Sequence, residues 1–120
     1  MTDEEIPQGV IYLPRESGRS YPMGGMQSVF KADGEETADT YSISEWWLDA
    51  RQPGPGAHSH DANDDIFYVL EGTITFLIGS RKIAASKGAF IRVPAGVTHD
   101  FENNSDSRGR VSQYLHSGRI

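Results

Sequence analysis

The apolar residues of this chain fall in short stretches separated by glycine, proline and polar residues. None of these stretches shows the 3.6-residue spacing of an amphipathic helix, so helices are not predicted. Tyr, Ile and two Trp in the segment 39–49 suit a pleated surface. Strands are predicted over the following ranges: 27–32, 39–49, 65–70, 73–78, 81–85, 89–93, 98–102 and 110–116.

Glycine and proline mark the boundaries of these segments. Segment 15–25 is polar and Gly-rich and is predicted to be a loop, and the pair Asp33-Gly34 is predicted to be a turn. A tight Gly-containing turn between 73–78 and 81–85 indicates a hairpin. About nine or ten short strands without a helix between them predict an all-β sandwich or small barrel, and the short connections make it antiparallel.

Composition narrows the class of protein. The 120 residues suit a single domain over 1–120, and the net charge of −6 argues against nucleic acid and anionic membranes as partners. The chain has no cysteine, which excludes disulfides, zinc–thiolate sites and thiol catalysis. The acidic start, 1–5, resembles no signal peptide, and no apolar run reaches the roughly 20 residues of a membrane span. A cytoplasmic location is therefore expected.

Three histidines and one carboxylate form the candidate chemistry. His58 and His60 are two residues apart and share a face if the segment is extended, Asp65 follows, and His99 lies downstream. Strand parity places Asp65 on one face with Phe67 and Val69, and His99 on one face with Phe101. Imidazole and carboxylate groups are ligands for divalent transition metals, so these four residues form a candidate metal site.

Two motifs around these residues resemble those of the cupin superfamily. The segment 54–72, GPGAHSHDANDDIFYVLEG, resembles the first cupin motif with Asp65 in place of the usual Glu, and the segment 88–103 matches the second motif through Gly88, Pro94, Gly96, His99 and Asn103. The N-terminal half resembles small single-domain cupins grouped with quercetin 2,3-dioxygenases. The resemblance implies a double-stranded β-helix (jelly roll), with His58, His60, Asp65 and His99 as ligands of one metal ion.

Asp65 is the point at which the chain departs from this pattern. Its side chain is one methylene shorter than Glu, about 1.3–1.5 Å. Three outcomes are open: the backbone moves inward, Asp65 binds through a water molecule, or the position stays open. Asp64 lies on the opposite face by parity and is not expected to replace it.

The resemblance implies a mononuclear metal-dependent dioxygenase that acts on a small enolic or aromatic substrate, with Asp65 as the catalytic base. The ion would be Fe, Mn, Ni, Co, Cu or Zn, and the ligand types do not choose among these. Two alternatives stay open on the same residues. One is a metal-dependent isomerase, cyclase or lyase, and the other is a module that binds a metal or a small molecule without turnover.

A homodimer is expected by analogy with small cupins, through the strands of residues 1–50 and one of two adjacent tryptophans. Trp46 and Trp47 face opposite ways, so one is expected in the core and the other at the pocket mouth or subunit interface. Arg92 is interpreted as a surface residue, and His116 as structural or exposed. The alternative interpretation of the three histidines is that they are surface or core residues of a jelly roll that binds no metal.

Overall fold

The structure is a computed structural model, and it describes residues 7–116. Nine strands and one short helix lie in this range. Their bounds are β1 (Arg19–Met23), β2 (Met26–Ala32), α1 (Gly34–Thr37), β3 (Tyr41–Leu48), β4 (Asp64–Glu71), β5 (Thr73–Ile78), β6 (Arg81–Ser86), β7 (Phe90–Val93), β8 (His99–Glu102) and β9 (Gly109–His116). The acidic segment 1–5, from which the cytoplasmic location was expected, lies outside the described residues.

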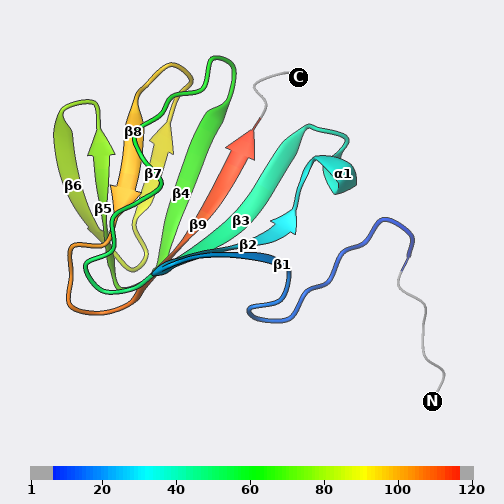
Figure 1. The fold of residues 1–120 in the computed structure, drawn as a ribbon. Coiled ribbons are helices and arrows are strands. Elements are labelled where there is room, and N and C mark those ends of the chain that lie inside the picture. Colours follow the sequence, from blue (N-terminus) through cyan, green and yellow to red (C-terminus); the bar gives the residue numbers. More distant parts are fainter. Residues whose placement is uncertain (1–6, 117–120) are drawn as a thin grey trace.

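The strands form two antiparallel sheets. A six-stranded sheet has the order β1-β2-β3-β9-β4-β7, and a three-stranded sheet has the order β6-β5-β8. Non-consecutive neighbours such as β3 and β9 show that the chain crosses between sheets, as in a jelly roll. Figure 1 shows β1 and β2 on the side of the larger sheet from which the N-terminal segment leaves. The predicted all-β antiparallel class is confirmed.

The core between the two sheets is built on three phenylalanines. Phe67 of β4, Phe76 of β5 and Phe101 of β8 are each at most 1% exposed. Their ring centroids are separated by 5.2, 5.6 and 6.4 Å, and the rings are tilted against one another. Full burial of one such side chain contributes about 1.5–3 kcal/mol. The alternation predicted for these strands therefore holds, because every second residue points into this layer.

Two of the sequence predictions for the N-terminal half are wrong. Segment 15–25, predicted as a loop, contains β1, whose five residues are all exposed at the edge of the larger sheet. The pair Asp33-Gly34, predicted as a turn, instead begins α1. Asp33 is its N-cap and forms a capping box with Glu36, whose side chain accepts from the Asp33 backbone N–H at 3.3 Å. The predictions relied on alternating apolar residues for strands and on 3.6-residue spacing for helices. A fully exposed strand shows no such alternation, and a helix of four residues is too short to show the spacing.

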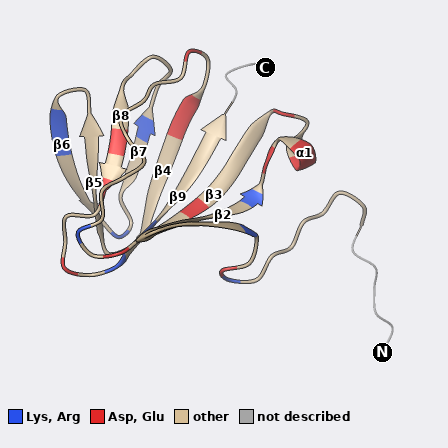
Figure 2. Ribbon diagram, viewed as in Figure 1, with Lys and Arg blue, Asp and Glu red and all other residues tan. Residues whose placement is uncertain are grey.

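Charged side chains are spread over the molecule. Figure 2 shows basic segments on separate strands, including β2, β6 and β7, and acidic segments on β4, β8 and α1. Within residues 7–116, no helix has the length and apolar character required to cross a bilayer.

Candidate metal centre

The backbone brings the two histidine-bearing segments together. His58 and His99 form an antiparallel bridge, in which the His58 N–H donates to His99 O at 3.0 Å and the His99 N–H donates to His58 O at 2.8 Å. The Gly96 N–H donates to His60 O at 2.7 Å. The loop that carries His58 and His60 is therefore fixed to β8 and to the turn before it by main-chain hydrogen bonds.

Two motif glycines are required by close approach of the chain. A Cβ atom on Gly54 would lie 1.6 Å from the carbonyl oxygen of Phe101, a backbone atom that cannot move aside. Gly72, in the turn between β4 and β5, has φ of +71°, a conformation that favours glycine, and faces the backbone of Arg108. These glycines let the histidine loop and the β4–β5 hairpin pack closely against their neighbours.

Hydrogen bonds select the ring nitrogen that each histidine presents to the site. Nδ1 of His58 lies 2.8 Å from Gly56 O, and Nδ1 of His99 lies 2.8 Å from Val97 O. A carbonyl oxygen only accepts, so Nδ1 carries the proton in both rings. In the neutral rings, Nε2 of His58 and of His99 is then the nitrogen with the free lone pair, as metal ligation requires.

The candidate ligand atoms of the three histidines and of Asp65 lie close together. Asp65 Oδ2 lies 2.5 Å from His99 Nε2 and 3.2 Å from His60 Nε2. The ligand atoms of His58, His60, Asp65 and His99 all lie within 4.8 Å of one another. His60 Nε2 is buried and makes no hydrogen bond in the described structure. Three imidazole nitrogens and one carboxylate oxygen gathered in this way are the donor types that divalent transition metals take, so the donor set fits a cation.

Burial divides the four residues into a floor and a rim. Asp65 is 0% exposed and His99 is 3% exposed. His58 and His60 are half-buried, and the His60 side chain is 28% exposed. An ion at this cluster would therefore be reached from the side of the histidine loop.

Asp65 reaches the histidines in spite of its shorter side chain. It is the second residue of β4, on one face with the buried Phe67, and its carboxylate contacts the imidazoles directly. The structure places the Asp65 carboxylate among the histidines, and the three outcomes for its binding of an ion stay predictions. Asp64 faces away, as predicted, and accepts from Arg92 Nη2 at 3.0 Å and from the Ala95 N–H at 3.2 Å. The Arg92 guanidinium, followed by the Ala95 N–H, holds the pKa of Asp64 below its ordinary value.

Aromatic rings line the inner side of the cluster. The Phe67 ring centroid lies 5.9 Å from that of His99, edge to face, and the Trp46 ring lies 5.6 Å from that of Phe101. Trp46 is half-buried on this face. Trp47 points to the other side of the sheet, where it is 7% exposed beneath a guanidinium group of Arg108 at 4.1 Å. The two tryptophans face opposite ways, as expected, and both are covered by the chain itself.

Gln113 and Ser44 also belong to the site, although sequence reasoning missed them. The Gln113 Nε2 atom donates to Asp65 Oδ1 at 3.0 Å, and Ser44 Oγ lies 3.5 Å from Gln113 Oε1. A signal was available in β9. Gln113 interrupts an inward row that otherwise holds Val111 and Leu115, and a polar residue in an apolar row commonly has a buried partner.

The other two residues considered from the sequence lie outside the cluster. The Arg92 side chain is 56% exposed and pairs with Asp64, so its interpretation as a surface residue is confirmed. His116, at the end of β9, stacks on Tyr114 with the ring centroids 6.1 Å apart.

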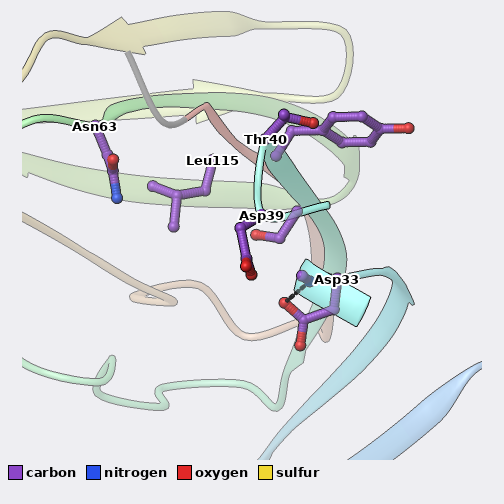
Figure 3. A pocket seen from close by; sticks show the side chains of 8 residues that line it. Asp33, Asp39, Thr40, Asn63 and Leu115 are labelled. Atoms are coloured by element: carbon purple, nitrogen blue, oxygen red, sulfur yellow. Dashed lines mark hydrogen bonds between the residues drawn. The ribbon is translucent and has the colours of Figure 1, made fainter. Parts of the chain in front are cut away.

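A small hollow lies at the α1 end of the larger sheet. Its volume is about 140 Å³. Figure 3 shows Asn63, Leu115, Asp39 and Asp33 around it, with the Asp33 carboxylate bonded to the start of α1. Leu115 pairs with Asp65 across β9 and β4, and with Ser42 across β9 and β3, so the hollow shares a cross-strand row with the cluster.

Solved structures with the same fold come from several bacteria. KdgF from Halomonas sp. superposes with a TM-score of 0.75 at 18% identity, covering 92% of this chain and 96% of that one. A predicted oxalate decarboxylase from Thermotoga maritima has a TM-score of 0.76 at 16% identity, covering 90% and 98%. Ectoine synthase from P. lautus has a TM-score of 0.69 at 10% identity, covering 86% and 72%. At these identities the likeness establishes the jelly-roll fold alone.

Sequence comparison gives the family. No protein of curated function matches the sequence. The family model described as the cupin domain matches residues 46–115, more than half of the chain and both histidine motifs. The chain belongs to the cupin domain family.

Proposed function

We propose that this chain binds one divalent transition metal ion through His58, His60, Asp65 and His99. One observation carries the proposal: the ligand atoms of three imidazoles and one carboxylate all lie within 4.8 Å of one another, and the two residues at the floor of the site, Asp65 and His99, are buried. The Nε2 atom of His60 supports it, because this atom is buried beside Asp65 Oδ2, at 3.2 Å, and makes no hydrogen bond in the described structure.

We further propose a mononuclear dioxygenase that acts on a small enolic or aromatic substrate. The rings of Phe67, Phe101 and Trp46 give the site an apolar aromatic wall, which suits a planar substrate and excludes water. When bound, the ion supplies Lewis acidity and, if it is redox-active, electron transfer to dioxygen. Asp65 is the carboxylate of the cluster, and we assign it the role of the base that accepts the proton of a substrate hydroxyl.

A second candidate uses the same residues without dioxygen. An isomerase, cyclase or lyase would need the ion only as a Lewis acid, with Asp65 as the group that moves a proton. The ectoine synthase and the predicted oxalate decarboxylase among the structural neighbours support keeping this candidate. If neither reaction occurs, the site serves as a binding module without turnover.

The test has two stages. Elemental analysis of the protein purified at pH 7.5, before and after reconstitution, is expected to give one transition metal ion per chain. His99→Ala should lower this ratio of metal to protein. Ser112→Ala should not, because Ser112 lies on the face of β9 that points away from the site. A protein without stoichiometric metal after reconstitution would refute the site. Oxygen consumption during turnover of enolic and phenolic compounds then separates the dioxygenase from the second candidate.

We also propose a cytoplasmic homodimer. The absence of cysteine suits a reducing compartment. The exposed edge strand β1 carries Tyr21 and Met23, which are 50% and 41% exposed, and such an edge is suited to pairing with a second copy. Trp47 is buried and Trp46 packs half-buried against the core, so we take the N-terminal strands as the better candidate for the interface. Sedimentation equilibrium of the protein and of Tyr21→Glu tests this, since a monomeric parent protein would contradict it.

A further inference from the structure

A line of polar groups crosses the inner face of the larger sheet and ends at Asp65. Trp46 Nε1 donates to Ser44 Oγ at 3.0 Å and to Gln113 Oε1 at 3.1 Å. Gln113 Nε2 in turn donates to Asp65 Oδ1 at 3.0 Å. The line therefore runs from β3 through β9 to β4, three neighbouring strands of one sheet.

The indole sets the direction of the Gln113 amide. An indole N–H only donates, so the amide atom that faces Trp46 must be the oxygen. The amide nitrogen then faces Asp65, where it can only donate. If the amide were reversed, an N–H would face the indole N–H and the amide oxygen would face a buried carboxylate, and both contacts would be repulsive.

The strand register places Gln113 where it can do this. Gln113 pairs with Ser44 on β3 and with Phe67 on β4, so its side chain lies on the face that points into the site. Asp65 is two residues before Phe67 on the same face, the diagonal position that a long side chain reaches across a strand pair. Asp65 itself is 0% exposed, so bulk solvent does not reach its carboxylate.

We propose that Gln113 is the positioning residue of this site, and that it orients the Asp65 carboxylate so that Oδ2 faces the three histidines. The proposal rests on the metal site proposed above. With Oδ1 held by the amide, a single oxygen remains for the ion, so Asp65 acts as a monodentate ligand. The Trp46–Gln113–Asp65 hydrogen bonds thus fix the rotation of the Asp65 carboxylate. This fixed orientation compensates for the methylene group that Asp65 lacks relative to the usual Glu.

The experiment compares cobalt(II) binding by the parent protein and three variants. Gln113→Leu removes the amide at nearly constant volume. Trp46→Phe leaves Gln113 in place but removes the N–H that orients it. Ser112→Ala is the matched control, because Ser112 is next to Gln113 on β9 but points to the opposite face, toward Tyr68 O. Cobalt(II) affinity is measured by chelator competition, the visible absorption spectrum reports coordination, and circular dichroism confirms folding.

Gln113→Leu is expected to weaken cobalt(II) binding about 10–100-fold and to change the visible spectrum, as loss of an outer partner of a ligand does. Trp46→Phe should change both quantities in the same direction by a smaller factor, and Ser112→Ala should match the parent. A folded Gln113→Leu with affinity within twofold of the parent and the same spectrum would overturn the proposal. If that variant does not fold, an unchanged Trp46→Phe overturns it. Failure of the parent protein itself to bind cobalt(II) refutes the metal site, whereas normal parent binding with unaltered variants refutes only the role of Gln113.

Discussion

Replacing Asp65 by Asn removes one negative charge from the floor of the metal centre and leaves the side-chain shape nearly unchanged. In the metal-free protein, the Asn amide could donate to His99 Nε2, which now faces a carboxylate oxygen at 2.5 Å. Gln113 would still donate to the remaining oxygen. With neutral imidazoles around it, the buried Asp65 carboxylate is an uncompensated charge with a large desolvation cost, which the neutral amide removes. The metal-free variant is therefore expected to melt at the same temperature as the parent or higher.

The metal-bound protein should respond in the opposite sense. An ion present at 100 times its Kd stabilises the parent by about 2.7 kcal/mol. A domain of this length has an unfolding entropy of about 0.25 kcal/mol per kelvin, so the melting temperature should rise by about 11 °C. If Asn weakens binding about a hundredfold, the same ion concentration equals Kd, stabilisation falls to about 0.4 kcal/mol, and the rise is below about 2 °C.

Calorimetric melting with and without the ion measures both effects, and Asp64→Asn is the control. Asp64 is the adjacent residue and undergoes the same chemical change, but it faces Arg92 outside the site, so the rise on metal addition should stay at the parent value. A metal-free Asp65→Asn that melts several degrees lower than the parent, with an undiminished rise on metal addition, would refute the reasoning. The contact of Asp65 with His99 would then be a stabilising ion pair and not a cation site.

Three further outcomes are expected. Dialysis from pH 7.5 to pH 5 should release the metal, because imidazole binds only when neutral and its ordinary pKa is about 6.5; retention of full occupancy at pH 5, by elemental analysis, would contradict the histidine ligands. Asn103→Ala should lower the free energy of unfolding by about 2–4 kcal/mol in urea titrations, since it leaves buried backbone carbonyls without their donor; a loss below about 1 kcal/mol would contradict this. Asn103 donates to Leu48 O, Asp49 O and Ser107 O. The lowered pKa of Asp64 means that its pairing with Arg92 stabilises the fold above the unfolded carboxyl pKa and is lost as the pH falls through the folded value. The stability difference between the parent and Asp64→Asn should therefore disappear in urea titrations near pH 2, and a difference that persists there would contradict the sign.

Most of the strands could be predicted from alternating apolar residues and from the turn residues between them. This worked because the strands that form the core place alternate, mostly apolar side chains in it. The predicted range 73–78 coincides with β5, and the other predicted strands correspond to β2, β3, β4, β6, β7, β8 and β9 within a few residues at each end. The pattern could not reveal β1. Its residues are all exposed, so pairing with β2 and not burial makes it a strand.

The ligand residues were predictable from spacing, whereas for Gln113 the sequence shows only that a polar residue interrupts an apolar row and does not show which residue it contacts. His58, His60, Asp65 and His99 occur in two recognisable motifs, and the fold brings their side chains together. The contact of Gln113 with Asp65 joins residues 48 positions apart and depends on the register of β4 against β9. Register is set by the packed sheet as a whole, so a local motif does not contain it.

The ligands also come from both sheets, since Asp65 lies in the six-stranded sheet and His99 in the three-stranded sheet. In residues 7–116 no backbone ladder joins these two sheets, which meet through side-chain packing. An ion held by both residues would add a direct link between the two sheets, next to the apolar core that they share. Amide hydrogen exchange would then slow together in β4 and β8 when the ion binds, and local opening of either layer would become part of one cooperative unit.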